Sequence, residues 1–245
     1  MTQFLTGKRA LITGGTKGIG LEVARALLAE GADVVVCGRN ADALRTAVDD
    51  LRSAGPSGKP NRKVYGQTAD VSNSEAVRDL FRSADSELGG LDILVNNAGS
   101  GVFRPAADIT VEEWDRVIGT NLSGVFYCSR EALTRFKNSG RGWIINISSL
   151  AGRNPMAGGA AYNASKFGLN GMTEAMMLDH RQQNVKVSYI MPGSVDTEFG
   201  GHPSGKSDWK IAPEDIAEIV LDILRKPERT LVSRVEVRPA KPPQK

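Results

Sequence analysis

A short apolar run followed by three closely spaced glycines constrains the fold of this chain more than any other feature. Residues 9–12 predict a strand, Gly14, Gly18 and Gly20 follow, and residues 21–28 have the apolar periodicity of a helix. Glycines are needed in such a turn because its backbone conformations are closed to other residues and because the helix must lie close to the strand. Amides at the start of the helix can then face a pyrophosphate. This strand, glycine turn and helix predict dinucleotide binding, and the alternative is a purely structural turn. The spacing Gly-x-x-x-Gly-x-Gly differs from the common dinucleotide fingerprint Gly-x-Gly-x-x-Gly.

Apolar runs alternate with helical patterns along the rest of the chain, without an internal repeat or a dividing linker. The sequence therefore predicts an α/β fold, a doubly wound parallel seven-stranded sheet in a single domain over residues 1–245, whose ligands bind at the carboxyl ends of the strands. The predicted strands are residues 9–12, 33–37, 63–67, 91–95, 141–148, 185–191 and 230–237. The predicted helices include residues 21–28, 41–53, 110–138, 160–182 and 213–224. A flexible substrate loop is expected at 194–211 and a frayed tail at 239–245.

Composition and charge exclude several classes of function. Of the 245 residues, 40% are hydrophobic, and the formal net charge of +3 is too mild for a nucleic-acid-binding surface. No stretch reaches the roughly 18 apolar residues of a membrane span, and residues 1–9 do not resemble a signal peptide, so we expect a soluble, cytoplasmic protein. Cys37 and Cys128 are expected to be buried free thiols. No metal site is predicted, because His180 and His202 lie apart and neither cysteine has a partner at ligand spacing.

The end of the second predicted strand bears on the choice of cofactor. An acidic residue there would accept hydrogen bonds from the ribose hydroxyls and repel a phosphate. This chain has Gly38 and Arg39 instead, and Lys17 lies in the glycine turn. Two cations beside the ribose would favour NADP(H) over NAD(H), whereas the alternative is that both are solvated surface charges. Asp70 is placed either to accept from the adenine amino group or to cap the helix that begins near Ser74.

Two further segments hold polar residues at positions where a parallel sheet gathers its ligands. Residues 96–99, Asn-Asn-Ala-Gly, follow the fourth predicted strand. Their side-chain amides are expected to tie neighbouring strand ends together, while Ala98 and Gly99 leave room for a flat ligand. The helical pattern at 110–138 is interrupted by Gly-Thr-Asn at 119–121, which predicts a local distortion that frees backbone groups for water.

Tyr162 and Lys166 are separated by one helical turn, and Ser149 lies shortly upstream. Residues four apart share a helix face, so the phenol and the ammonium point into the same space. Because a fixed cation favours the phenolate, the sequence predicts an acid/base pair in which the pKa of Tyr162 is lowered toward neutrality. Taken alone, however, this spacing also occurs by chance on many helices.

Taken together, these residues carry a resemblance: the chain resembles the short-chain dehydrogenase/reductase family from end to end. The resemblance implies a Rossmann-type fold and hydride transfer between a nicotinamide cofactor and a carbonyl or alcohol. It also implies assembly as a homodimer or homotetramer through the helices at 110–138 and 160–182. The matching residues are Thr13, Gly14, Gly18, Gly20, Asp70, Asn96, Asn97, Ala98, Gly99, Asn121, Ser149, Tyr162, Lys166, Pro192 and Gly193.

The resemblance also implies roles for single residues. Tyr162 would give a proton to the carbonyl oxygen, and Ser149 would hydrogen-bond that oxygen as its charge develops. Lys166 would hold the nicotinamide ribose and lower the pKa of Tyr162, Asn121 would anchor a water that relays protons to Lys166, and Ser148 would stabilise the strand end. The residues expected to bind the cofactor are Gly14, Thr16, Lys17, Gly18, Ile19, Gly20, Arg39, Asp70, Val71, Asn97, Ala98, Gly99, Tyr162, Lys166, Pro192, Gly193, Val195 and Thr197.

One departure from the family pattern bears on the substrate. Many relatives that reduce 3-oxoacyl chains end in a glycine-rich segment, whereas residues 236–242 of this chain read Glu-Val-Arg-Pro-Ala-Lys-Pro. The prediction is therefore an NADP(H)-dependent oxidoreductase that acts on a small-molecule carbonyl or secondary alcohol. The alternatives are a 3-oxoacyl-[acyl-carrier-protein] reductase and a non-catalytic NADP-binding sensor or interaction protein. Four residues are expected either in the pocket wall or in ordinary packing: Ser100, Phe103, Met156 and Phe199.

Overall fold

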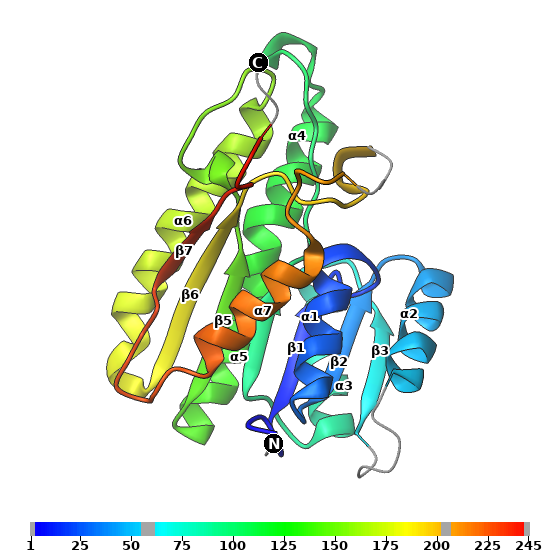
Figure 1. Cartoon of the computed structure of the whole chain (residues 1–245), viewed down its shortest axis with the longest axis vertical. Helices are drawn as coiled ribbons and strands as arrows, with labels where there is room; N and C mark the ends of the chain where they lie inside the picture. Colours follow the sequence, from blue (N-terminus) through cyan, green and yellow to red (C-terminus); the bar gives the residue numbers. More distant parts are fainter. Residues whose placement is uncertain (1–2, 55–61, 202–206, 243–245) are drawn as a thin grey trace.

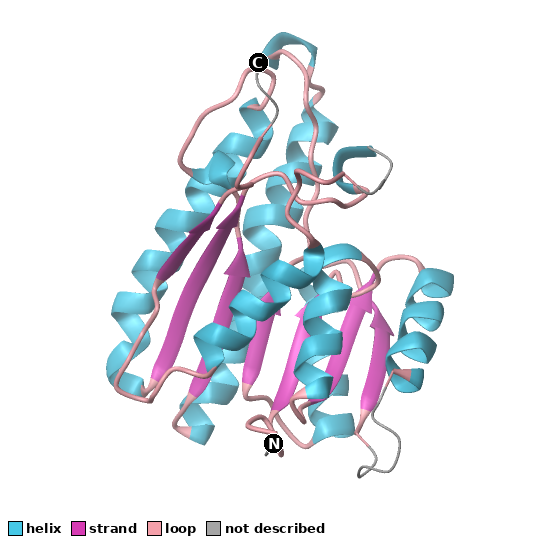
Figure 2. Ribbon diagram, in the orientation of Figure 1, coloured by secondary structure: helices cyan, strands magenta, loops and turns pink. Residues whose placement is uncertain are grey.

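A parallel sheet forms the centre of the protein, for which the computed structural model describes residues 3–54, 62–201 and 207–242. Within these residues one seven-stranded sheet has the order β3-β2-β1-β4-β5-β6-β7, and all neighbouring strands pair in parallel. Figure 2 shows the strands side by side with helices in front of and behind them. The predicted doubly wound, Rossmann-type arrangement is confirmed. The strands are β1 (Arg9–Thr13), β2 (Asp33–Gly38), β3 (Val64–Thr68), β4 (Ile93–Asn96), β5 (Gly142–Ile147), β6 (Val185–Pro192) and β7 (Arg234–Val237).

Each face of the sheet has its own hydrophobic core, because successive side chains of a strand point to opposite faces. In β1, Ala10 and Ile12 join the core covered by α1, α2 and α7, whereas Leu11 joins the core covered by α3, α5 and α6. Figure 1 shows α1 and α7 together in front of the sheet. The helices are α1 (Gly18–Ala29), α2 (Ala41–Ser53), α3 (Ser74–Leu88), α4 (Val111–Ile118), α5 (Gly124–Ser139), α6 (Ala160–His180) and α7 (Pro213–Leu224).

The order of the strands creates a crevice at one point of the sheet. The chain leaves β1 toward β2 on one side, and β4 later pairs with β1 on the other side. In sheets of this kind, ligands bind where the strand order reverses, beyond the carboxyl ends of the strands. The ends of β1 and β4 are followed by the glycine turn and by residues 96–99, the two segments expected to meet there.

The helical pattern at residues 110–138 is interrupted, as predicted. α4 begins with a capping box between Thr110 and Glu113, and α5 ends before Gly140, whose φ is +71°. Between them, residues Gly119–Ser123 form a π-helical turn. Such turns are rare in proteins, and those that occur are often found at functional sites.

The carboxyl-terminal part differs from the prediction at the start of its strand. β7 begins only at Arg234 rather than at residue 230, because a backbone hydrogen bond from Thr230 to Pro227 closes a turn there. Residues 240–242 of the tail are exposed, and its fraying from residue 239 stays a prediction. Val237 pairs with Pro192 at the end of β6, and its carbonyl accepts from the amide of Gly193, so the tail is directed to the carboxyl edge of the sheet. Residues 243–245 lie outside the described residues.

The thiols and possible metal ligands can be placed for the described part of the chain. Cys37 and Cys128 are both free and buried, as predicted, and burial raises the pKa of Cys37 to about 12. Among the described residues no group of three or more His, Cys, Asp or Glu side chains could hold a metal ion. No helix in the same ranges is long and apolar enough to cross a membrane. His202 lies outside the described residues.

Candidate active site

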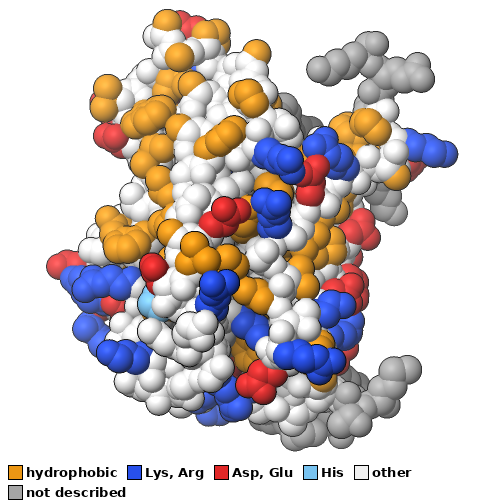
Figure 3. Space-filling model, turned by 90° about the vertical axis from the view of Figure 1, so that its left-hand side faces the viewer, with side chains coloured by type: hydrophobic (Ala, Val, Ile, Leu, Met, Phe, Trp, Pro, Cys, Tyr) orange, Lys and Arg blue, Asp and Glu red, His pale blue; other side chains and the backbone are white. Residues whose placement is uncertain are grey.

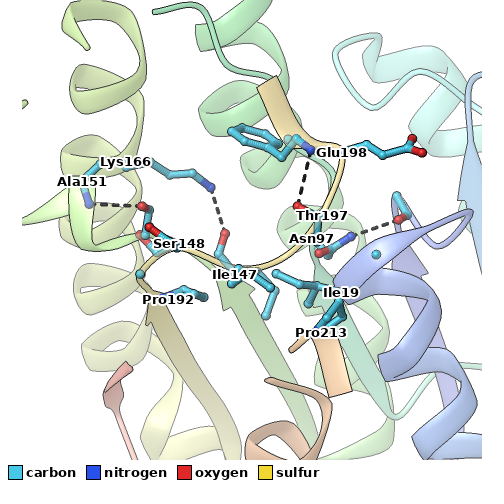
Figure 4. A pocket seen from close by; sticks show the side chains of 18 of the residues that line it. Ile19, Asn97, Ile147, Ser148, Ala151, Lys166, Pro192, Thr197, Glu198 and Pro213 are labelled. Atoms are coloured by element: carbon cyan, nitrogen blue, oxygen red, sulfur yellow. Dashed lines mark hydrogen bonds between the residues drawn. The ribbon is translucent and has the colours of Figure 1, made fainter. Parts of the chain in front are cut away.

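A large cavity lies along the carboxyl edge of the sheet, at the crevice between β1 and β4. Its volume is about 1280 Å³, and its walls come from the glycine turn, the ends of β4 and β5, the start of α6 and the loop after β6. Figure 4 shows these walls converging from different elements around one space. Of the eighteen residues expected to bind the cofactor, all except Gly20 line the cavity. The walls converge because parallel strands deliver all these segments to the same edge of the sheet.

The glycine turn is shaped by close approaches of backbone and side chains. Gly14 has φ of +65°, and a Cβ there would lie 2.9 Å from Cα of Ala98. Gly20 lies against Gly14 and the side chain of Asn97, so a methyl group would overlap both. Nδ2 of Asn97 donates to the carbonyls of Thr13 and Gly14, each at 3.0 Å. The expected tie between neighbouring strand ends is confirmed at Asn97, and Gly20 serves the packing of α1 rather than the cavity wall.

The amino-terminal end of α1 opens into this cavity without a capping side chain. Its N-cap residue, Lys17, makes no side-chain cap hydrogen bond, and the first turn of the helix contains no acidic residue. The first amides of a helix need partners, and their partial positive charge favours an anion. Because glycines also keep side chains out of the turn, these residues fit the pyrophosphate of a dinucleotide.

The loop after β6 crosses the cavity and meets the glycine turn. A Cβ at Gly18 would lie 3.1 Å from Cγ2 of Thr197, and Nζ of Lys17 forms an ion pair of 2.6 Å with Oε2 of Glu198. This pairing was not foreseen, because nothing in the sequence relates residues so far apart. Arg39 lines the cavity just beyond the end of β2 and is exposed. Lys17 is therefore already paired with a carboxylate, which would compete with a phosphate for its ammonium. Arg39 forms no ion pair within the described ranges.

Asp70 does not cap α3, so that alternative is wrong. Its Oδ1 accepts from the amide and the hydroxyl of Ser72, at 2.9 and 2.7 Å, while the N-cap of α3 is Asn73. Asp70 and Val71 both line the cavity, beyond the end of β3. The hydrogen bonds to Ser72 fix the carboxyl group there, and a role toward adenine stays a prediction.

Tyr162, Lys166 and Ser149 come together at the other end of the cavity. Tyr162 and Lys166 project from α6 and are 8% and 4% exposed. Nζ of Lys166 donates to the carbonyl of Ile147 at the end of β5, at 2.9 Å (Figure 4). Ser149 follows β5, and its Oγ accepts from the amide of Ala151 at 3.1 Å. One hydroxyl, one phenol and one ammonium thus face a common space, as the sequence predicted.

The acid/base balance of this group differs from the prediction. Burial raises the pKa of Tyr162 above its ordinary value, and a hydrogen bond from Ser149 offsets only part of the rise. Burial also lowers the pKa of Lys166 to about 8. Nζ of Lys166 lies 5.8 Å from the centre of the Tyr162 ring and is held by Ile147. The predicted lowering of the Tyr162 pKa is therefore wrong for this structure, because desolvation of the phenol is the largest influence on its pKa.

Asn121 lies in the π-helical turn and uses its side chain to hold a loop. It is fully buried, its Oδ1 accepts from the amide of Ser100, and its Nδ2 donates to the carbonyl of Ser100 and to Oγ of Ser165. The side-chain amide therefore has protein partners for its acceptor and for both donor hydrogens. It fixes the loop that leads to Phe103, and a water relay to Lys166 stays a prediction.

The pocket wall includes three of the four residues expected there. Phe103, Met156 and Phe199 line the cavity, whereas Ser100 is engaged with Asn121 and does not. Ser148, beside Ser149, donates to Oδ1 of Asn170, in keeping with a role at the strand end. Sequence reasoning missed several lining residues, because only the folded loop after β6 and the returning tail bring them to the cavity: Trp209, Lys210, Glu214, Arg238, Pro239 and Pro242.

The chain is similar to known oxidoreductases along nearly its whole length. The family described as short chain dehydrogenase matches residues 8–205. An uncharacterized oxidoreductase of Staphylococcus aureus (strain N315) is 35% identical over 235 residues, which are 96% of this chain and 98% of that protein.

Solved structures with the same fold include two that contain a nicotinamide cofactor or its derivative. An alcohol dehydrogenase of the archaeon Thermococcus sibiricus, complexed with 5-hydroxy-NADP, has a TM-score of 0.88 and is 28% identical, with 97% of this chain and 99% of that chain covered. A metagenomic short-chain oxidoreductase in complex with NADP has a TM-score of 0.84 and is 36% identical over the same shares of the two chains.

Proposed function

The chain belongs to the short chain dehydrogenase family of oxidoreductases, and on this premise we propose that it transfers hydride between NADP(H) and a carbonyl or secondary alcohol, with Tyr162 as the acid and base. The observation that carries this proposal is the grouping of Tyr162, Ser149 and Lys166 at one end of the dinucleotide-sized cavity. A protein that only bound the cofactor would have no need of a buried proton donor there.

The side chains divide the work of carbonyl reduction between them. NADPH, when bound, supplies the hydride. Tyr162, kept protonated by its burial, donates its proton to the substrate oxygen, and the hydroxyl of Ser149 steadies the charge that develops on that oxygen. Lys166, whose pKa of about 8 lies near neutrality, can return a proton to the tyrosinate. One carbonyl, one hydride and one proton give one alcohol, and the same residues serve the reverse reaction.

The adenosine end of the cavity supports a preference for NADP(H). Gly38 takes the position of a ribose-binding carboxylate, and Arg39 follows it at the cavity wall. Arg39 offers a planar fork that suits a phosphate. Two similar structures were solved with NADP or a derivative of it. We assign the 2′-phosphate chiefly to Arg39, because Lys17 is already paired with Glu198.

Steady-state oxidation of NADPH and of NADH, measured side by side over a panel of carbonyls, tests the function. The panel contains ketones, aldehydes, diketones and one 3-oxoacyl thioester. Turnover of free ketones or aldehydes with NADPH supports the proposal. A thioester that far surpasses every free carbonyl would point to an acyl-carrier reductase. Tight NADPH binding without turnover on any carbonyl would point to a non-catalytic sensor.

We also propose that the protein assembles into a homodimer or homotetramer. Large hydrophobic side chains are exposed on α4, α5 and α6, including Val111 at 70%, Phe126 at 47% and Leu178 at 56%. Figure 3 shows several hydrophobic groups on the upper left part of one side of the molecule. Patches of this kind mark protein interfaces. Sedimentation velocity would contradict the proposal if it gave the mass of one chain, 26.2 kDa, at micromolar concentration.

A further inference from the structure

Two large hydrophobic side chains pack around the ring of Tyr162 and stay partly exposed, and a third lines the same cavity. Phe103 and Phe199 are each 39% exposed, Met156 is 50% exposed, and all three line the cavity. Single exposed apolar residues are ordinary, but a group of them inside a cavity leaves a contiguous apolar wall facing water. Such a wall is stabilised when an apolar ligand covers it. The substrate end of the cavity is therefore built to receive an apolar group.

The rings of Phe103, Tyr162 and Phe199 form a triangle. The ring centres of Phe103 and Tyr162 lie 5.4 Å apart with the edge of one ring toward the other, and those of Tyr162 and Phe199 lie 5.6 Å apart. Phe103 and Phe199 lie 6.4 Å apart, again edge to face. Aromatic rings prefer these arrangements, and an array of edges and faces offers the same contacts to a further ring.

A glycine makes room for this triangle. A Cβ at Gly101 would lie 2.9 Å from Cε2 of Phe103 and 3.0 Å from Cε1 of Phe199, which is closer than side-chain carbons approach. Phe103 comes from the loop after β4 and Phe199 from the loop after β6, so two separate walls of the cavity meet at Gly101. The close approach of two phenylalanines therefore depends on this position having no side chain.

Two charged side chains near the rings already have partners. Glu198, next to Phe199, pairs with Lys17 at 2.6 Å, and Nζ of Lys166, 5.8 Å from the centre of the Tyr162 ring, donates to the carbonyl of Ile147. Leu150, Asn154 and Pro155 also line the cavity and carry no charge. An anionic group beside the rings would lose its hydration, while the ammonium of Lys166 is already engaged with Ile147. The wall therefore favours an uncharged ligand.

We propose that the substrate is an uncharged aryl ketone or aryl aldehyde whose aromatic ring lies against Phe103 and Phe199. This inference rests on the proposed function of the same site. In the reduction, hydride forms the new C–H bond at the carbonyl carbon, and the π electron pair of the carbonyl takes the proton from Tyr162. The carbonyl is reduced to an arylcarbinol, NADPH is oxidised to NADP⁺, and a proton from solvent restores Tyr162.

Three methyl ketones separate the aromatic contribution from size alone. Acetophenone carries an aryl ring, cyclohexyl methyl ketone carries a saturated ring of similar size, and 2-butanone carries neither. Loss of a buried ring should lower kcat/KM with NADPH by about tenfold or more from acetophenone to 2-butanone. The saturated ring should rank between them, since it keeps the apolar area but not the edge-to-face contacts. Equal values for acetophenone and cyclohexyl methyl ketone would contradict the aryl assignment.

Two variants locate the effect at the proposed wall. Phe103→Ala and Phe199→Ala should each raise the KM for acetophenone by about three- to thirtyfold more than they raise the KM for 2-butanone. Phe4→Ala is the matched control, because Phe4 is 36% exposed and does not line the cavity. If the variants raised the KM for acetophenone and the KM for 2-butanone equally, a specific aryl site would be refuted.

The failure of this inference differs from the failure of the proposed function. If 2-butanone turns over as well as acetophenone, the enzyme is a carbonyl reductase and the aryl assignment is wrong. If no carbonyl oxidises NADPH while NADPH fluorescence still reports binding, both the assignment and the function are wrong. Ligand-observed NMR adds a readout besides activity: acetophenone should bind to the NADP⁺ complex of the wild type about three- to thirtyfold more tightly than to that of Phe103→Ala.

Discussion

At the scale of single residues, the buried ammonium of Lys166 links the stability of the fold to the proton return proposed for this residue. Its surroundings lower its pKa to about 8, although Nζ donates a hydrogen bond of 2.9 Å to Ile147. Burial makes the charged form costly, and the same burial brings proton release near neutrality. Lys166 therefore lowers the stability of the fold at low pH. Its lowered pKa suits the return of a proton to Tyr162 that we propose for it.

The stability of the protein relative to Lys166→Met should rise with pH. The folded pKa of about 8 lies below the ordinary value of 10.5, so between these values the unfolded chain binds more protons than the folded one. The wild type should gain up to about 3 kcal/mol of unfolding free energy relative to the variant across this window. Urea unfolding at a series of pH values measures the difference. A difference that stays constant, or falls with rising pH, would show that the ammonium is not buried as described.

The two cations near the predicted phosphate site should respond differently to substitution. Arg39→Asp should weaken NADPH binding by about tenfold or more and spare NADH, because a carboxylate would repel the phosphate. Glu198→Gln should tighten NADPH binding by about two- to fivefold, since it frees Lys17 from an exposed ion pair. Fluorescence titration at low and high salt measures both constants. Unchanged NADPH affinity in both variants would place the phosphate elsewhere.

The positions of residues that strand order determines were predicted correctly. A pKa that depends on burial was not. Asn97 and the glycine turn follow from strand order, because parallel strands bring their ends to one edge. The pKa of Tyr162 could not be predicted from its spacing to Lys166, because spacing does not reveal desolvation. The partner of Lys17 was also beyond the sequence, since Glu198 approaches it only through the fold of a long loop.

At the scale of elements, β5 and α5 meet where a glycine allows close contact. Gly142 begins β5, and a Cβ there would overlap the ring of Phe136, which is fully buried on α5. The ring has no free volume to move into, because protein interiors are closely packed. Gly171 on α6 is the opposite case, since a Cβ there would meet nothing within 4 Å.

These two glycines form a matched pair for a stability measurement. Gly142→Ala should lower the unfolding free energy by about 1–3 kcal/mol through overpacking. Gly171→Ala should raise it by about 0.5–1 kcal/mol, because alanine loses less backbone entropy in a helix. Chemical denaturation of both variants gives the two values. A neutral Gly142→Ala would mean that α5 does not lie on β5 as described.

The elements themselves were predicted to within a few residues where periodicity was strong. α7 matches its predicted span, and the interruption of the long helical pattern at residues 119–121 is a π-helical turn. The start of β7 was predicted poorly. Residues 230–233 lie beside β6, where Ser188 and Tyr189 donate to the carbonyls of Val232 and Ser233, but only Arg234–Val237 pair as a strand. This outcome depends on contacts between distant segments, which local patterns do not contain.

At the scale of the whole molecule, the cavity is a consequence of topology. The order β3-β2-β1-β4-β5-β6-β7 places the glycine turn and residues 96–99 at the switch point, and α6 brings Tyr162 to the neighbouring end of the same edge. The alternation of strands and helices was enough to predict this arrangement. The apolar wall around Tyr162 was not, because it joins two loops that only the complete fold brings together.

We propose that this arrangement makes Tyr162 the proton donor of an NADPH-dependent reductase, and the variant Tyr162→Phe is the sharpest test of that role. The variant keeps the ring and its contacts with Phe103 and Phe199 and removes only the hydroxyl. With a carbonyl that the wild type reduces, kcat should fall by about 10²–10⁴-fold, while the Kd for NADPH stays within about twofold. A variant that still turns over at a comparable rate would contradict the account, because the proton would then come from another group.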